Sequence, residues 1–204
     1  MTNHATAFFH VGERVRGRER NQVRPAASHR LQLTRSAGSA RGTVRVVPLD
    51  LKHELEALTD ALIADAVPFA ICGGIAVTIY GAPRLTDDLD LLVRAVDLAA
   101  TKRVAASVGF DVPAAPMLFA AETARARTIH RISKLDGADL LTLDLVIAEG
   151  VLEDVWNTRV IVEWETRRVP IVSRDGLLIM KRLAGRPKDL LDIAALEGPS
   201  DDDA

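Results

Sequence analysis

The segment from residue 73 to residue 93, GGIAVTIYGAPRLTDDLDLLV, constrains this chain more than any other. It opens with the pair Gly73-Gly74 and, after 13 intervening residues, carries Asp88-Leu89-Asp90 at the start of an apolar run. Side chains alternate along a strand, so Asp88 and Asp90 share one face, about 7 Å apart along the backbone. Two carboxylates so placed repel each other unless a cation lies between them. The segment therefore predicts a strand that presents an acid pair to a cation.

Mg²⁺ suits such a pair, because it takes oxygen ligands and binds through one or two carboxylates plus substrate phosphates. The glycine pair stands between a predicted strand, 69–72, and a predicted short helix, 75–80. Free N–H groups at a helix start attract an anion, and a glycine lets a phosphate approach without a Cβ in the way. Each feature alone also fits a plainer interpretation, namely solvated acids on a strand edge and a tight turn.

Several other classes of site find no support. The chain contains neither the Gly-rich phosphate loop ending in Gly-Lys nor the Gly-x-Gly-x-x-Gly pattern of dinucleotide-binding folds. Cys72 is the only cysteine, so neither an intramolecular disulfide nor a cysteine-based zinc site is available. No apolar run approaches the roughly 20 residues that span a bilayer. We therefore expect a cytoplasmic protein with no membrane partner.

The chain of 204 residues predicts one domain with extensions. Residues 1–47 hold nine arginines, no lysine and two glutamates, with no lasting hydrophobic period, and we expect a disordered Arg-rich extension. It could be a solvated tail, an RNA-binding arm or leader sequence from a start codon placed too far upstream. Residues 48–198 would form the folded domain, and residues 199–204 an acidic tail.

Hydrophobic periodicity within residues 48–198 predicts an α/β fold with a small mixed β-sheet flanked by helices. Asp50 is placed to cap a first helix, and Ser173 a last one that reaches about residue 196 with an interruption near 185–187. The predicted helices and strands between these ends are a helix at 96–108 and strands at 88–93, 127–134, 139–147, 160–164 and 169–172.

The glycine turn followed by the acid-pair strand is the pattern of the nucleotidyltransferase superfamily, with its polymerase-β-like fold. The finer pattern, GG-x-A-V-x-x-Y-G-x-x-R-x-T-x-D-x-D-L-L-V, resembles the AbiEii and MenT-type toxins of bacterial toxin–antitoxin systems. The segment 181–193, KRLAGRPKDLLDI, is similar to the closing segment of that branch. Many superfamily members have Gly-Ser where this chain has Gly73-Gly74, and larger relatives have an additional helical region that this chain lacks.

The resemblance implies a third carboxylate from a neighbouring strand. Asp144 is the candidate, because Leu143, Leu145 and Ile147 surround it and a buried unpaired carboxylate would be costly. Asp139 is the alternative, although it lies beside the predicted turn. Asp88, Asp90 and Asp144 would then form the metal site, with Asp144 either completing it or accepting the proton of the attacking hydroxyl.

Further residues are implied to bind the nucleotide. Gly73 and Gly74 would contact the phosphates, and the cations Arg84, Lys181 and Lys188 would balance their charge. Asp189 and Asp192 lie three residues apart, hence on one helix face, and would line the nucleotide pocket. Each of these cations and acids could instead be an ordinary solvated surface charge.

The resemblance also implies a function: transfer of a nucleotide, with CTP or UTP favoured, to the 3′ end of tRNA, which blocks aminoacylation. One alternative is a nucleotidyltransferase that modifies a small molecule such as an aminoglycoside, or a protein. Another is a non-catalytic binding module. A local basic strip of Arg84, Lys181, Arg182, Arg186 and Lys188 would contact RNA phosphates.

Thr86 is a candidate regulatory residue, because it stands two residues before Asp88. In the resembling branch a Ser or Thr at this place is phosphorylated to silence the enzyme. A phosphate there would add close to two negative charges beside the acid pair and repel the triphosphate. The implied partner is a cognate antitoxin that acts as a kinase, an inhibitor or both.

Overall fold

The computed structural model describes residues 49–120, 123, 125–164 and 166–198. Its helices are α1 (Leu51–Ala64), α2 (Gly73–Ile79), the short 3-10 helix η1 (Ala95–Asp97), α3 (Leu98–Ser107), α4 (Val151–Asn157), α5 (Arg174–Ala184) and α6 (Pro187–Glu197). Its strands are β1 (Ala70–Ile71), β2 (Asp88–Val93), β3 (Val112–Pro113), β4 (Met117–Phe119), β5 (Arg127–Asp136), β6 (Asp139–Ile147), β7 (Val160–Trp164) and β8 (Arg167–Ile171). The predictions for residues 1–47 and 199–204 lie outside the described residues.

The strands of the described chain form one sheet in the order β3-β5-β6-β2-β1-β8-β7, with β4 paired to β5. The pairs β2–β6 and β1–β8 are parallel, and the other neighbours run antiparallel. The sheet is therefore mixed, and helices flank it, so the predicted α/β class is confirmed. The strands β3 and β4 were not predicted, because two or three residues do not establish an alternation of side chains.

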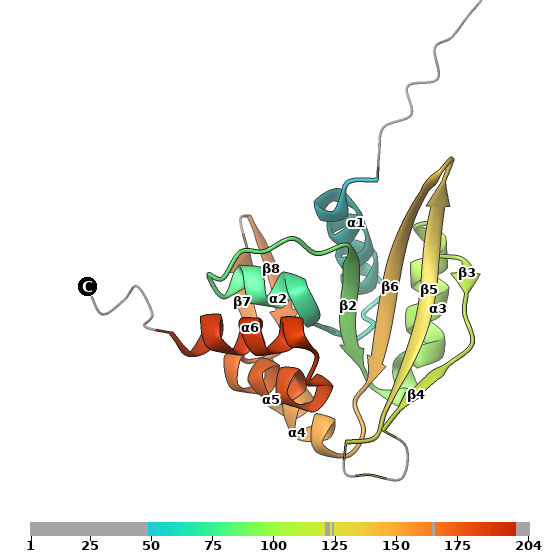
Figure 1. Ribbon diagram of the computed structural model, residues 1–204. Coiled ribbons are helices and arrows are strands. Elements are labelled where there is room, and N and C mark those ends of the chain that lie inside the picture. The colour runs from blue at the N-terminus through green and yellow to red at the C-terminus, as the bar shows by residue number, and fades with distance from the viewer. Residues whose placement is uncertain (1–48, 121–122, 124, 165, 199–204) are drawn as a thin grey trace, which may run out of the picture. The chain divides into compact units, whose positions relative to one another are not determined.

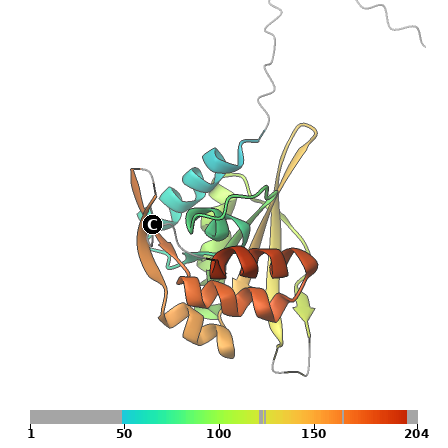
Figure 2. The same ribbon diagram turned by 60° about the vertical axis from the view of Figure 1, so that its left-hand side comes forward.

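The helices form a layer on each side of the central strands. Figure 1 shows α1 and α3 behind β2, β6 and β5, whereas α2, α5 and α6 lie on the other side. In Figure 2 the antiparallel pair α5 and α6 crosses in front of the sheet. The central strands are thus covered on both faces, and the face toward α5 and α6 is the one that holds the polar side chains described below.

The ends of the helices follow from the capping residues that the sequence offers. The Asp50 carboxylate accepts hydrogen bonds from the backbone N–H groups of Lys52 and His53, at 2.9 and 3.3 Å. At the other end, the Ser173 hydroxyl accepts from the backbone of the first turn of α5. Gly185, at φ +63°, ends α5 in the left-handed conformation, and Pro187 begins α6. The predicted interruption near 185–187 is therefore the turn between two helices.

The core strand β2 divides its side chains between two environments. Leu89 and Leu91 are fully buried. Asp88 and Asp90 alternate with them and point to the opposite face. One prediction needs correction nearby: α2 begins at Gly73, so the glycine pair forms its first turn and does not precede it. None of the described helices is both long and apolar enough to cross a membrane.

Candidate active site

Three carboxylates lie on the face of the sheet toward α5 and α6. Because β2 and β6 are parallel neighbours with Asp90 opposite Asp144, these two side chains lie side by side, with Asp88 two residues before Asp90 on the same face. Asp144 is 7% exposed, so it does not point into solvent. We call Asp88, Asp90 and Asp144 the acid cluster.

The acid cluster changes the acidity of its central member. Burial, together with the negative charges of Asp144 and Asp88, raises the pKa of Asp90 to about 6, against a smaller opposite effect of Lys181 and Arg186. Burial and the other two carboxylates thus disfavour the charged form of Asp90, and Lys181 and Arg186 offset this effect only in part. Such a position favours a bound cation.

Gly73 lies directly against the acid cluster, and Gly74 lies beside the loop that precedes it. A Cβ on Gly73 would be 1.9 Å from the Oδ2 atom of Asp90, and one on Gly74 would be 2.6 Å from the hydroxyl oxygen of Thr86. Gly73 also has φ +65°, which side chains rarely adopt. The backbone N–H of Cys72 donates to the carbonyl of Asp90 at 3.0 Å and fixes this approach. Two features far apart in sequence are thereby brought into contact.

A pocket opens beside the acid cluster, between the sheet and the helices α4, α5 and α6. Its polar lining consists of Asp90, Asp144, Asp189 and the cations Arg127, Arg131, Lys181 and Arg186. Its apolar lining includes Met117, Phe119, Ile129, Val146, Leu152, Leu177, Met180 and Leu183. The guanidinium of Arg127 lies 5.0 Å from the ring centre of Phe119 at one wall. The pocket can therefore hold a ligand that is anionic at one end and apolar at the other.

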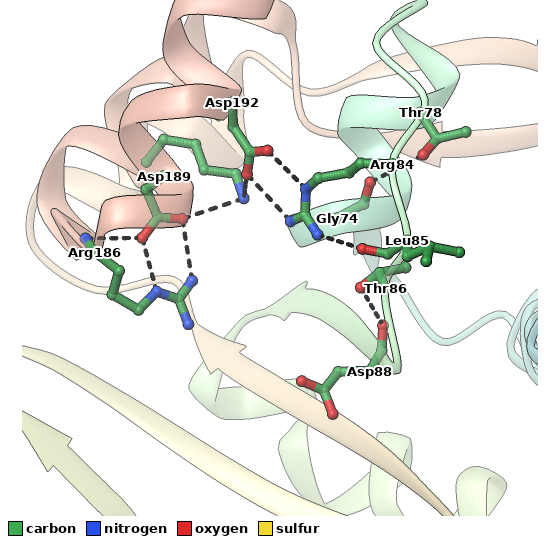
Figure 3. A network of polar contacts seen from close by, with 10 residues as sticks. Gly74, Thr78, Arg84, Leu85, Thr86, Asp88, Arg186, Asp189 and Asp192 are labelled. Atoms are coloured by element: carbon green, nitrogen blue, oxygen red, sulfur yellow. Dashed lines mark hydrogen bonds and ion pairs between the residues drawn. The ribbon is translucent and has the colours of Figure 1, made fainter.

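A network of charges connects α5 and α6 to the loop before β2 (Figure 3). Asp192 accepts from the Nε of Arg84 at 2.6 Å and lies 2.6 Å from the Nζ of Lys181. Asp189 accepts from Lys181 at 3.3 Å and from the Nε of Arg186 at 2.7 Å. Lys181 is only 3% exposed, so it joins the two aspartates inside the protein.

These contacts control the charge of both aspartates. Burial by itself would raise the pKa of Asp189, but the hydrogen bond and charge of Arg186 outweigh it and lower that pKa. The pKa of Asp192 is lowered in the same way, because hydrogen bonds from Lys181 and Arg84 exceed the effect of burial. Both side chains therefore remain ionised and hold the three cations in place.

Arg131 is a site residue that the sequence analysis missed. Its Nε and Nη2 donate to Oδ1 and Oδ2 of Asp144, both at 2.8 Å, and β5 places it directly opposite Asp144. A signal existed in the sequence: a turn at Asp136-Gly137 sets the register of the two strands and pairs residue 131 with residue 144. Arg127 was missed as well, since its contact with the pocket depends on β4 and α5.

Other predicted residues have different positions. Lys188 is exposed and does not line the pocket, so the structure does not bring it to the acid cluster. Arg182 is also exposed and pairs with Glu197. Thr86 lies beside Gly74, and its hydroxyl donates to the carbonyl of Asp88 at 3.5 Å. Cys72 is buried, as expected for a small apolar residue.

The donor groups fit a magnesium ion at two of the three acids. Among the residues that the structure describes, no three His, Cys, Asp or Glu side chains are grouped so as to hold a metal ion. Asp144 has both oxygens engaged by Arg131, which leaves Asp88 and Asp90. Mg²⁺ needs no more than one or two carboxylates when phosphates and water complete its shell. The prediction that Asp144 is a third ligand stays a prediction.

Comparisons with known proteins give structural similarities only, since no protein-family model and no curated protein matches the chain. A candidate nucleotidyltransferase from Thermotoga maritima, TM1012, is 13% identical with a TM-score of 0.49, over 69% of this chain and 88% of that one. ANT(2″)-Ia in complex with adenylyl-2″-tobramycin is 12% identical with a TM-score of 0.45, over 70% and 84%. JHP933 from Helicobacter pylori is 18% identical with a TM-score of 0.41, over 71% and 63%. These values assign neither an activity nor a substrate to this chain.

Proposed function

We propose that this protein is a metal-dependent nucleotidyltransferase that moves a nucleoside monophosphate from a nucleoside triphosphate to an acceptor hydroxyl. The observation that carries the proposal is the close approach of Gly73 to Asp90, because both residues line a pocket together with several basic side chains. The acceptor oxygen forms a bond to the α-phosphorus, the bond from that phosphorus to the bridging oxygen breaks, and pyrophosphate leaves. The proton of the hydroxyl goes to a carboxylate of the acid cluster.

Each part of the site has a role in this proposal. Asp88 and Asp90 would hold Mg²⁺, which when bound supplies positive charge to the phosphate oxygens. Gly73 and Gly74 lack a Cβ, which leaves room for the Asp90 and Thr86 side chains against the first turn of α2. Lys181 contributes a fixed positive charge that costs no rearrangement when charge develops on the leaving group.

The cations around the pocket depend on two aspartates. Asp189 and Asp192 were predicted to bind nucleotide, and their contacts support a less direct role. They orient Lys181, Arg84 and Arg186 through hydrogen bonds of 2.6 to 3.3 Å. We propose that they act on the nucleotide through these cations. Lys188, being exposed, would contact only the outer part of a substrate.

We propose the tRNA 3′ end as the acceptor and CTP or UTP as the donor, so that the protein acts as a toxin by blocking aminoacylation. The support is the resemblance of segments 73–93 and 181–193, together with exposed cations beside the pocket. Arg186 is exposed and lines the pocket, and Arg182 and Lys188 lie on the nearby surface of α5 and α6. Contacts of this kind with RNA phosphates would weaken as salt is raised.

We also propose that Thr86 is the site at which a cognate antitoxin silences the enzyme, by phosphorylation or by binding. The hydroxyl of Thr86 lies in the loop between Arg84 and Asp88, beside the first turn of α2. A phosphate on it would place negative charge next to Asp88 and Gly74. Such a charge would oppose binding of a triphosphate.

Incubation of the full chain with each labelled nucleoside triphosphate, Mg²⁺ and total RNA tests the proposed reaction. Label should appear on tRNA, and Asp88→Ala should reduce transfer by several orders of magnitude because a metal ligand is lost. Asp87→Ala is the matched control, since Asp87 is adjacent but exposed and should transfer normally. Label on a small molecule or a protein, but never on tRNA, would replace the toxin proposal with one of the alternatives. Absence of transfer to any acceptor would leave the non-catalytic module.

A further inference from the structure

We infer that Asp144 is not a metal ligand but a positioning residue, which holds Arg131 as a permanent cation against a phosphate of the bound nucleotide. In this arrangement Arg131 would supply positive charge that a second metal ion would otherwise supply. The inference rests on the proposed function, because it assumes that the pocket receives a nucleoside triphosphate.

The contact between Arg131 and Asp144 uses both oxygens of the carboxylate. Two parallel hydrogen bonds of 2.8 Å join Nε to Oδ1 and Nη2 to Oδ2. This side-by-side geometry matches the guanidinium fork to the carboxylate and is among the stronger charge-assisted contacts. The Asp144 side chain is 9% exposed, so little water reaches it to compete. A metal ion at Asp144 would have to share oxygens that already accept from a cation, which disfavours metal binding there.

The sheet itself holds this pair in place. Arg131, Asp144 and Asp90 lie opposite one another on the adjacent strands β5, β6 and β2. Residues directly paired across neighbouring strands point to the same face of the sheet. The cation is thus fixed beside Asp144 by the backbone register, on the face where the acid cluster meets the pocket. A surface ion pair between flexible side chains would have no such constraint.

Arg131 keeps donors available for a ligand. Its side chain is 39% exposed and lines the pocket. Within the described part of the chain, its hydrogen bonds use only Nε and Nη2, and a guanidinium has further N–H groups on Nη1 and Nη2. Such a planar, always charged group binds phosphate oxygens well. Arg131 can therefore hold Asp144 with one edge and contact a phosphate with the other.

The two remaining acids, Asp88 and Asp90, then determine how many metal ions the site binds. Asp144 is neutralised by Arg131, and the described residues contain no group of three metal-binding side chains. Asp88 and Asp90 suffice for one magnesium ion that shares the phosphates of the nucleotide. One metal ion and one fixed arginine would supply the positive charge that two metal ions supply in other nucleotide-transfer sites.

A count of bound Mn²⁺ by electron paramagnetic resonance tests this inference on the full chain, with and without CTP. Asp144→Asn should bind the same number of ions as the wild type, with affinity within about threefold, whereas Asp88→Asn should lose at least tenfold. The amide introduced by Asp144→Asn would keep an oxygen that accepts from Arg131, so the fold should survive. Loss of an ion in Asp144→Asn would overturn the inference.

Arg131 variants test the second half of the inference. Arg131→Met should weaken CTP binding at least tenfold and free Asp144, so that one additional Mn²⁺ ion binds. Arg131→Lys should recover part of the CTP affinity, because it restores the positive charge without the planar guanidinium group. This variant also tests the inference if Arg131→Met fails to fold. Unchanged CTP affinity in both would overturn the inference. A wild type that binds neither Mn²⁺ nor CTP would instead remove the proposed function, and this inference with it.

Discussion

The substitution Gly73→Ala tests whether the contact between the glycine turn and the acid cluster has the consequences that its geometry demands. The new methyl group would lie 1.9, 2.4 and 2.6 Å from the Oδ2, Cγ and Cβ atoms of Asp90. Rotating the carboxylate away relieves the first two contacts but not the third, since Cβ is fixed by the strand. Asp90 must therefore leave its position, or β2 must shift.

The stability cost has two parts. An alanine at φ +65° costs about 1–2 kcal/mol from the left-handed backbone alone. The collision with Asp90 adds about 1–3 kcal/mol, as for other cases of overpacking. The free energy of unfolding, measured in urea, should thus be about 2–5 kcal/mol lower in the variant. Transfer activity and Mn²⁺ binding should both fall at least tenfold, because Asp90 is displaced.

Gly137→Ala provides the matched control. Gly137 has φ +60°, but nothing lies within 4 Å of a Cβ there. It should lose only about 1–2 kcal/mol and keep full activity. The double variant Gly73→Ala/Asp90→Gly removes the colliding atoms of Asp90. Its loss of unfolding free energy should therefore be smaller than the sum of the losses in the two single variants. Equal stability losses at Gly73 and Gly137, with activity intact in both variants, would refute the reasoning.

Two further predictions concern the loop before β2 and the buried charges. Thr86→Glu should lose most transfer activity, because it adds negative charge beside Asp88, whereas Thr86→Ala should keep a substantial part of it. Equal transfer rates in the wild type, Thr86→Glu and Thr86→Ala would refute a regulatory role. The pKa of Asp192 is lower in the folded state than in the unfolded state, where an aspartate has a pKa of about 4. Its ion pairs therefore stabilise the folded protein fully above about pH 4, and this stabilisation is lost as the pH falls further. The stability difference between wild type and Asp192→Asn, measured by urea unfolding, should accordingly be constant from about pH 5 to 7 and shrink below about pH 4; a difference that does not change with pH would contradict the assignment.

Local patterns in the sequence were enough to predict most of the secondary structure. The period of the leucines, the caps at Asp50 and Ser173 and the break at Gly185 all act over a few residues, so the helices α1, α5 and α6 could be predicted from the chain alone. The alternation along β2 likewise placed Asp88 and Asp90 on one face. The short strands β3 and β4 escaped prediction because their pairing with β5 defines them, and not their own residues.

The sequence by itself determined the chemical groups of the candidate site: two acids on one strand face, a glycine pair, and a basic segment near the C-terminus. Only the tertiary structure decided how those groups are used. The register of β5, β6 and β2 places Arg131 opposite Asp144, so that the two side chains form an ion pair. The packing of α6 beside α5 brings Asp189 and Asp192 into ion pairs with Lys181. The physical reason is range. Helix caps and strand alternation are set by neighbours in sequence, whereas the partner of a buried charge is set by which strands and helices meet across the fold, and burial makes that choice of partner decisive.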